Sequence, residues 1–545
     1  MATDVEIAQA HVLQPISDIA EKIGIPTSAL IPYGTTKAKV DITAASPAPR
    51  GKLVLVTGIS PTPAGEGKST VLIGLADAIG LTGIKTAVAI REPSLGPVMG
   101  IKGGAAGGGY SQIVPMEDIN LHFTGDFHAI TAANNTLAAM IDNHIHHGNT
   151  LGIDPRSITW QRCLDVNDRS LRHVVTGLGG MAHGVPTETG FTITAASEIM
   201  AVLCLATSLA DLELRIGNIV VAQSYDKKPI TARDINAHGA LTALLKDAIN
   251  PNLVQTLGGT PAFVHGGPFA NIAHGCNSLI ATETALTFAD VVLTEAGFGS
   301  DLGAEKFFDI KARTGGLNVD SCVIVATIRS LKHNAVDRTD DEKLLEQGIC
   351  NLERHVANIR KFGIEPIVAL NEFSGDSSAD IAWMTQWAKN FGVTLVPVSV
   401  WQNGGEGAND LAAAVVNSLS GGTAHPLYEP EDGIEKSIGT IATEIYGAND
   451  VVWSKQARKD LAFLQENGWD TLPVCISKTQ YSFSDDPTLL GAATGHTLHV
   501  RQLLPRIGAG FVVALTGDVM TMPGLPKKPA AENIAVRDEK IVGLF

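Results

Sequence analysis

Short apolar runs rich in β-branched residues alternate with longer helical stretches along most of the chain, and this alternation constrains the fold more than any other feature. The runs have the length of strands and lie at 53–56, 86–90, 218–222, 290–294, 321–326, 366–370 and 394–398. Strands separated by helices form βαβ units, whose strands lie parallel in one sheet. The sequence therefore predicts an α/β fold with a mostly parallel sheet.

The length of the chain, 545 residues, exceeds what one hydrophobic core usually fills. The strand pattern continues past residue 360, in the same sheet or in a second one like it, and stops at a Gly/Pro-rich stretch at 421–430. Two amphipathic helices are expected after that stretch, at 434–446 and 454–466. We expect a large N-terminal domain at 1–360, an α/β segment at 361–425 and a smaller α/β domain at 426–545.

Composition and charge disfavour several classes of function. The longest apolar runs, 322–326 and 511–515, are far shorter than a membrane-spanning helix, and the N-terminus lacks the features of a secretory signal, so we expect a cytoplasmic protein. The formal net charge of −16, with scattered lysine and arginine, disfavours nucleic acid as a partner. The six cysteines lie far apart without a C-x-x-C pair, which argues against a zinc site or a disulfide framework and predicts buried thiols.

The strand at 53–57 leads into the loop Gly58-Ile-Ser-Pro-Thr-Pro-Ala-Gly-Glu-Gly-Lys-Ser-Thr70 and then into a helix expected at 71–79. Strand, glycine-rich loop and helix in this order are the setting of a phosphate-binding P-loop. The generic motif G-x-x-x-x-G-K-[ST] requires glycine at position 62, where this chain has threonine, so the motif is only partly met. Gly-Lys-Ser before a helix also occurs by chance, but the strand before it favours binding of ATP.

Each residue of this loop is a candidate nucleotide contact: Thr62, Pro63, Ala64, Gly65, Glu66, Gly67, Lys68 and Ser69. Gly65 and Gly67 let successive backbone N–H groups point toward phosphate oxygens. Lys68 can reach the bridge between the β- and γ-phosphates, and the hydroxyl of Ser69 is placed to hold Mg²⁺.

Arg91 follows the strand at 86–90, at the carboxyl end where open α/β sheets bind their ligands. A guanidinium there can hold a carboxylate or a transferring phosphoryl group through two parallel hydrogen bonds. The alternative is a surface arginine paired with the adjacent Glu92. The glycine-rich stretch 101–110 comes next, and it either offers Lys102 and Tyr110 as ligand contacts or forms a tight structural loop.

One aspartate and a group of histidines give weaker evidence for a catalytic or metal-binding role than the loop and Arg91 do. Asp126 lies just before an expected helix, and an aspartate in that place more often caps a helix than takes part in catalysis. His144, His146 and His147 resemble a metal cluster, but they lack the H-x-x-x-H spacing of a helical ligand pair, so a solvated helix end is expected.

Two aromatic residues, Phe373 and Trp401, each follow a predicted strand by a few residues. Two rings at the ligand edge of a sheet can enclose a flat heterocycle, which contributes about 0.5–1.5 kcal/mol beyond the buried area. Single aromatic residues more often belong to a core. Only the shared position of these two after neighbouring strands favours a binding slot.

Long strings of low degeneracy make the chain resemble formate–tetrahydrofolate ligase over nearly its whole length. They include Thr62-Pro-Ala-Gly-Glu-Gly-Lys-Ser69, Arg91-Glu-Pro-Ser-Leu-Gly-Pro97, Gly103-Gly-Ala-Ala-Gly-Gly-Gly-Tyr110 and Leu121-His-Phe-Thr-Gly-Asp-Phe-His128, and others at 166–169, 251–256, 265–275, 294–299, 479–486 and 523–526. The family also has threonine at the position of Thr62, so that departure from the generic motif supports the resemblance. The chain has no room for the additional dehydrogenase/cyclohydrolase domain of trifunctional members, so it resembles the monofunctional form.

The resemblance implies a P-loop-type domain that joins formate to tetrahydrofolate with ATP, giving 10-formyltetrahydrofolate, ADP and phosphate. Mg²⁺ would be required, and a monovalent cation, K⁺ or NH₄⁺, would activate. Formate would attack the γ-phosphate to give formyl phosphate, and N10 of the folate would then take the formyl group. Members are typically homotetramers, so a homotetramer is expected.

The resemblance also implies roles for the candidate residues. Lys68 and Arg91 would neutralise the transferred phosphoryl group and hold the acyl phosphate, and Asp126 would help N10 lose its proton. Phe373 and Trp401 would bracket the pterin, and Tyr110 would contact the folate.

Two other classes of function are alternatives to a ligase. A P-loop switch protein of the partitioning or metal-chaperone kind would need a second lysine early in its loop, and residues 61–64 supply none. A non-enzymatic folate-binding protein would use the aromatic pair alone, and it would leave the phosphate loop and Arg91 without a role.

Overall fold

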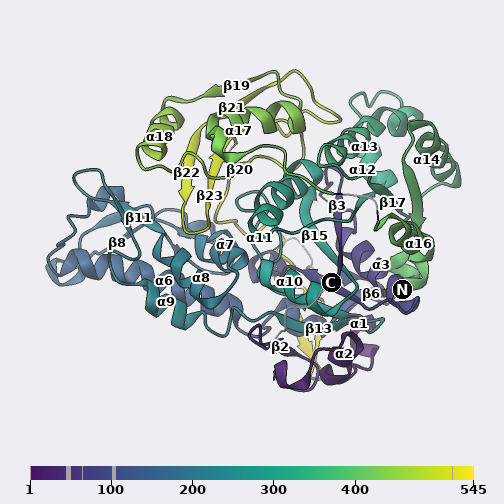
Figure 1. The fold of residues 1–545 in the computed structure, drawn as a ribbon, viewed down its shortest axis with the longest axis horizontal. Coiled ribbons are helices and arrows are strands. Elements are labelled where there is room, and N and C mark those ends of the chain that lie inside the picture. The colour runs from purple at the N-terminus through teal and green to yellow at the C-terminus, as the bar shows by residue number, and fades with distance from the viewer. Residues whose placement is uncertain are drawn as a thin grey trace.

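The computed structural model describes residues 2–44, 51–63, 65–100, 106–420, 423–517 and 519–544. A twelve-stranded sheet runs through its centre, and the main path of that sheet has the order β1-β2-β13-β14-β4-β15-β3-β16-β17-β18 (Figure 1). In this order the strands are Leu30–Pro32, Ala38–Val40, Asn252–Thr256, Pro261–Val264, Thr86–Ile90, Val291–Gly299, Lys52–Gly58, Ser321–Ala326, Ile367–Asn371 and Thr394–Val398. Off this path, β6 (Ser111–Val114) pairs with β13 and with β5 (Gly107–Gly108).

The seven strands from β14 to β18 lie parallel, each to its neighbours, whereas β1, β2, β13 and β14 pair antiparallel. Strands β3, β4, β16 and β17 are buried along almost their whole length. Burial on both faces explains why these strands are continuous apolar runs rather than alternating ones. The predicted α/β fold with a mostly parallel sheet is confirmed.

Helices cover both faces of this sheet. On one face, Val54 and Val56 of β3 pack in a cluster with residues of α3 (Lys68–Leu81) and α16 (Asn409–Ser418). On the other face, Leu53 and Leu55 belong to the cluster that includes α10 (Leu279–Phe288) and α13 (Leu344–Arg360). Successive side chains of a strand point to opposite faces, and this alternation divides the core into two layers.

The predicted strand at 218–222 forms, but it lies outside the parallel sheet. It is β11 (Val220–Gln223), which pairs antiparallel with β12 (Pro229–Thr231) in a separate sheet. A tight turn follows β11, where Ser224 N–H donates to the carbonyl of Lys228 and Lys227 has a φ of +68°. The chain therefore reverses at once, and no helix carries it back to a parallel position.

The strands after residue 360 continue the same sheet, because β17 pairs with β16 and β18 pairs with β17. The division of the chain into domains at 360 and 425 stays a prediction. Beyond 426 the chain forms smaller sheets, made of β20 (Val474–Ser477), β22 (Gln502–Arg506) and β23 (Phe511–Leu515), and of β19 (Asp450–Trp453) with β21 (Thr497–Val500).

The two helices expected in this last region are confirmed. They are α17 (Ile434–Thr440), which continues as a π-helix over Ile441–Tyr446, and α18 (Lys455–Glu466) (Figure 1). The cysteines are buried as expected, except for Cys350, which is half-buried. In the part of the chain that the structure describes, every helix is too short or too polar to cross a membrane.

Candidate functional site

The loop between β3 and α3 contains two glycines in the left-handed region of backbone conformation. Gly65 and Gly67 have φ values of +77° and +70°, a region that favours glycine. Gly67 precedes the first residue of α3, Lys68, and no side chain caps this helix end. The positive end of the α3 dipole lies at this loop and favours an anion there. Ala64, also expected in this loop, lies outside the described residues.

A hydrogen bond between Glu66 and Thr62 closes this loop. The carboxylate of Glu66 is buried, and it accepts hydrogen bonds from the Thr62 N–H at 2.8 Å and from the hydroxyl of Thr327 at 2.6 Å. On its other side, Asn371 Nδ2 donates to the Glu66 carbonyl at 3.1 Å, and Arg329 donates to the Gly65 carbonyl at 2.6 Å. The ends of β16 and β17 therefore hold the loop, and Pro63 is exposed at its tip.

One buried carboxylate joins three of the predicted site residues. Glu295 Oε2 accepts a hydrogen bond from Ser69 Oγ at 2.8 Å and lies 3.7 Å from Lys68 Nζ, while its Oε1 lies 3.3 Å from Arg91 Nη2. Glu295 lies on β15, between β3 and β4 in the sheet, which Figure 1 shows beside β3. Lys68 also donates to the carbonyl of Ala296.

Arg91 faces this shared site rather than its sequence neighbour. Its Nη2 binds Glu295 and its Nη1 lies 3.5 Å from the carbonyl of Pro268. The alternative of a surface pair with Glu92 is wrong, because the Glu92 side chain is buried and its Oε2 has no hydrogen-bond partner. Arg91 and Lys68 thus lie on the same carboxylate, Glu295.

The carboxylate of Glu295 is buried more deeply than the two cations beside it. Burial raises the pKa of Glu295, but the charges of Lys68 and Arg91 and the hydrogen bonds from Ser69 and Arg91 outweigh it and lower the pKa to about 2. Glu295 is therefore an anion at neutral pH. Its side chain is 1% exposed, against 14% for Lys68 and 21% for Arg91. A ligand that approaches from solvent meets the two cations first, so the site favours anions.

Asp126 lies in a different environment. Its carboxylate is buried, forms an ion pair with Lys39 of β2 at 2.8 Å, and accepts a hydrogen bond from Asn252 of β13 at 2.8 Å. It is the first residue of α6 (Asp126–His146), whose N-cap is Gly125 and has no side-chain cap. The expectation that Asp126 caps this helix is wrong, because Lys39 and Asn252 occupy its carboxylate. Burial and the charge of Asp126 raise the pKa of Glu92 well above its ordinary value.

The aromatic candidates lie at the ends of neighbouring strands. Asn371 of β17 pairs with Val398 of β18, and Phe373 and Trp401 follow within a few residues. Phe373 is 39% exposed, and Trp401, in α15 (Val400–Asn403), is half-buried. These exposures leave both residues accessible at the sheet edge.

Tyr110 lies beside Trp401. Its N–H donates to the Trp401 carbonyl at 2.9 Å, and its side chain is 53% exposed. A Cβ at Gly109 would lie 2.7 Å from the Trp401 indole, so only glycine allows this approach. The turn is tightly packed and the Tyr110 side chain is exposed, so the structural-loop interpretation and a ligand contact by Tyr110 are compatible. Lys102, named with it, lies outside the described residues.

His144, His146 and His147 lie at the C-terminal end of α6, half-buried or exposed, as expected for a solvated helix end. Within the described ranges, no group of three or more His, Cys, Asp or Glu side chains is arranged to hold a metal ion. Mg²⁺ is usually bound through one or two carboxylates and substrate phosphates rather than by such a cage.

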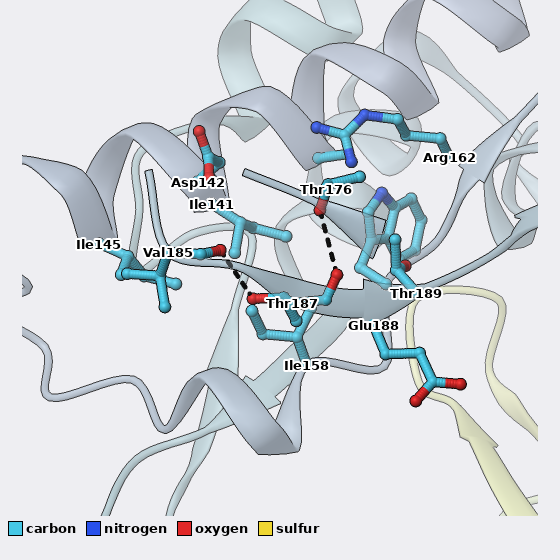
Figure 2. A pocket seen from close by; sticks show the side chains of 12 residues that line it. Ile141, Asp142, Ile145, Ile158, Arg162, Thr176, Val185, Thr187, Glu188 and Thr189 are labelled. Atoms are coloured by element: carbon cyan, nitrogen blue, oxygen red, sulfur yellow. Dashed lines mark hydrogen bonds between the residues drawn. The ribbon is translucent and has the colours of Figure 1, made fainter. Parts of the chain in front are cut away.

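Two cavities have linings that do not include Lys68, Glu295 or Arg91. Figure 2 shows the first, between α6 and the hairpin of β8 (Val174–Thr176) and β9 (Thr187–Thr189). Its volume is about 50 Å³. Its rim carries Asp142, Arg162 and Glu188, and it contains none of the predicted site residues. A second cavity, of about 150 Å³, extends from Glu92 along the start of α6.

Sequence reasoning missed Glu295, Arg329 and Asn371. Glu295 directly follows the apolar run at 290–294, so a carboxylate at the carboxyl end of a strand was the available signal. The sequence does not reveal, however, that β15 lies between the strands that lead to Lys68 and Arg91.

Comparison with known proteins identifies the family of the chain. The family model for formate–tetrahydrofolate ligase matches residues 2–545. A formate–tetrahydrofolate ligase of Corynebacterium diphtheriae is 73% identical over 550 residues, with 100% of both chains covered. One of Corynebacterium jeikeium is 69% identical and covered to 98%, and one of Staphylococcus aureus is 58% identical and covered to 99%, each over 100% of this chain. The chain belongs to the formate–tetrahydrofolate ligase family, and it is a ligase.

Proposed function

We propose that this ligase uses ATP to join formate to tetrahydrofolate through formyl phosphate, releasing ADP and phosphate and giving 10-formyltetrahydrofolate. The observation that carries the proposal is the meeting of Lys68, Ser69 and Arg91 on one buried carboxylate, Glu295. Membership of the ligase family disfavours a switch protein and a binding protein without activity.

The first step brings two anions together, formate and the triphosphate of ATP. The phosphates would lie on the N–H groups of the first turn of α3 and on Lys68, and Arg91 would hold the formate carboxylate in line with the γ-phosphorus. A formate oxygen forms the new bond to phosphorus, and the bond to the β,γ-bridging oxygen breaks. Lys68 and Arg91 would neutralise the charge on the moving phosphoryl group, which is the largest contribution expected from the protein.

In the second step Arg91 would retain formyl phosphate while N10 of the folate attacks the formyl carbon, the bond from that carbon to the phosphate oxygen breaks, and the N10 proton passes to the leaving phosphate. Phe373, Trp401 and Tyr110 would hold the folate, and their exposed positions at the ends of β17 and β18 support this role. We keep Asp126 as a contributor to the loss of the N10 proton. Because Lys39 and Asn252 bind its oxygens, it would act through them as a positioning residue.

Mg²⁺ belongs to the same proposal. The Ser69 hydroxyl, on the first turn of α3 and bonded to an ionised carboxylate, has the oxygen chemistry that Mg²⁺ prefers. When bound, the ion would neutralise the β- and γ-phosphates. Activation by K⁺ or NH₄⁺, a homotetramer and a cytoplasmic location are proposed from the family resemblance.

Positional isotope exchange tests the stepwise route. ATP labelled with ¹⁸O at the β,γ-bridge is incubated with the enzyme, Mg²⁺ and formate, without folate. Reversible formation of ADP and formyl phosphate moves the label to a non-bridging position of the β-phosphate. We expect exchange that requires formate; full ligase activity without any such exchange would contradict a free-standing first step.

A further inference from the structure

Two oxygen atoms of the site have the spacing of neighbouring ligands of a small cation. Ser69 Oγ and Glu295 Oε2 are 2.8 Å apart. An octahedral Mg²⁺ with bonds of about 2.0–2.1 Å places adjacent ligand oxygens about 2.9 Å apart. We infer that Glu295 is the second protein ligand of the nucleotide-bound Mg²⁺, beside Ser69. This inference rests on the proposed binding of ATP at the loop before α3.

The rival role for Glu295 is that of an anchor for Lys68 and Arg91. Two ion pairs in which both side chains are buried are short: Lys39–Asp126 is 2.8 Å and Lys478–Asp301 is 2.6 Å. Glu295 lies farther from both of its cations, at 3.7 Å from Lys68 and 3.3 Å from Arg91. Its short contact is with the neutral hydroxyl of Ser69 instead, which is the group expected beside Mg²⁺.

The backbone fixes the position of this carboxylate. Glu295 pairs with Val56 of β3 and is the last residue of the regular ladder before a register shift that ends at Gly299, so its side chain leaves the end of a paired strand. The backbone after it is tightly packed: Phe298 has a φ of +61°, and a Cβ at Gly303 would lie 1.9 Å from the Gly297 carbonyl oxygen. Little movement is open to Glu295, which suits a ligand of an ion that tolerates little distortion.

Binding of ADP with and without a metal separates the two roles. Mn²⁺ replaces Mg²⁺ because its binding to the ADP complex is followed by electron paramagnetic resonance, and ADP alone is titrated by calorimetry in EDTA. We expect Glu295→Gln to weaken Mn²⁺ binding to the ADP complex by about tenfold or more. ADP affinity in EDTA should stay the same or rise, because a negative charge near the phosphates is removed.

Asp320→Asn is the matched control. Asp320 is also buried and paired with a lysine, Lys52 at 2.9 Å, but it lies at the opposite end of β3. This variant should leave both affinities within about twofold of the parent, because surroundings far from the nucleotide contribute little.

Several outcomes would overturn the inference. An anchor role predicts that Glu295→Gln weakens ADP equally with and without Mn²⁺, because Lys68 and Arg91 lose their position in both states. Unchanged Mn²⁺ affinity would exclude ligation as well. If Glu295→Gln does not fold, Glu295→Asp gives the same comparison with the charge kept and the reach shortened. Failure of the parent chain to bind ADP in EDTA would instead contradict the nucleotide site itself.

Discussion

Arg329 stacks on Phe373, with its guanidinium 4.9 Å from the centre of the aromatic ring, and the same side chain donates a 2.6 Å hydrogen bond to the Gly65 carbonyl. One arginine thus links the loop proposed for ATP to an aromatic residue proposed for the folate. The neighbouring Asn371 makes a parallel link to Glu66. A change in the position of the loop on nucleotide binding would therefore be transmitted to Phe373 through Arg329.

Replacing Arg329 by leucine should weaken this link. We expect the affinity for tetrahydrofolate to fall and to become less dependent on whether ADP is bound, measured by fluorescence titration with and without saturating ADP. Loss of a cation–π contact and a hydrogen bond at an exposed site corresponds to about 1–2 kcal/mol, or roughly 5- to 30-fold. Arg458→Leu removes a similar contact, 4.8 Å from the ring of Trp453, and serves as the control. Equal coupling in both variants would argue against a connecting role for Arg329.

Arg91→Lys should keep the charge but lose the two-pronged grip on formyl phosphate. We expect a loss of about 10²-fold or more in kcat, and a loss of similar size in the formate-dependent positional isotope exchange. Both reactions need the acyl phosphate held, so they should fall together. Near-normal exchange with impaired ligation would instead assign Arg91 to the folate half of the reaction.

Trp401→Ala should raise the KM for tetrahydrofolate while the KM for ATP changes little, because stacking is lost with one substrate only. The isotope exchange without folate should remain intact. Initial rates with each substrate varied in turn measure both constants. A parallel rise in both would show that Trp401 supports the loop region as a whole, through the Tyr110 contact.

The buried carboxyl of Glu198, at the start of α7 (Glu198–Leu205), predicts how stability depends on pH. Burial raises its pKa from 4.5 to about 7, against the opposing effects of Arg506 and the Gly508 N–H. Because the folded pKa is the higher one, the stability that Glu198 contributes is complete below pH 4.5 and is lost as pH rises toward 7.

Glu198→Gln should therefore flatten the fall of the unfolding free energy over that range, as measured by urea denaturation at pH 5, 6 and 7. The exposed Glu342→Gln should follow the parent curve. An unchanged slope in Glu198→Gln would show that the carboxyl is already ionised in the folded protein.

The local sequence pattern predicted where the strands lie but not which strands pair with one another. The apolar runs that became β3, β4 and β15 to β18 are visible because a strand buried on both faces must be apolar throughout. The run at 218–222 has the same character, yet the turn at Ser224 to Lys228 sends it into a hairpin. The pairing of this strand therefore depends on the residues that follow it rather than on its own composition.

The site was predictable where one segment carries the chemistry, and not where distant segments meet. Arg91 directly follows β4, and Lys68 and Ser69 begin the helix after the loop that follows β3, so their place at the sheet edge was foreseeable. Asp126 was misread as a cap because its partner, Lys39, comes from a strand 87 positions earlier. Glu295 was overlooked because its role depends on the insertion of β15 between β3 and β4.

The order of the strands also bears on how the enzyme is made. Glu66 and Asn371, which hold the two sides of the loop together, are 305 positions apart in the chain. At roughly 5–20 residues per second, the ribosome needs about 15–60 s to pass from one to the other. β15 is complete only at Gly299 and β16 only at Ala326, so for most of that time β3 exists without either strand beside it, and its apolar faces and open edges are exposed to the cell. The nucleotide cannot protect this stage, because the segments that complete its site have not yet been synthesised.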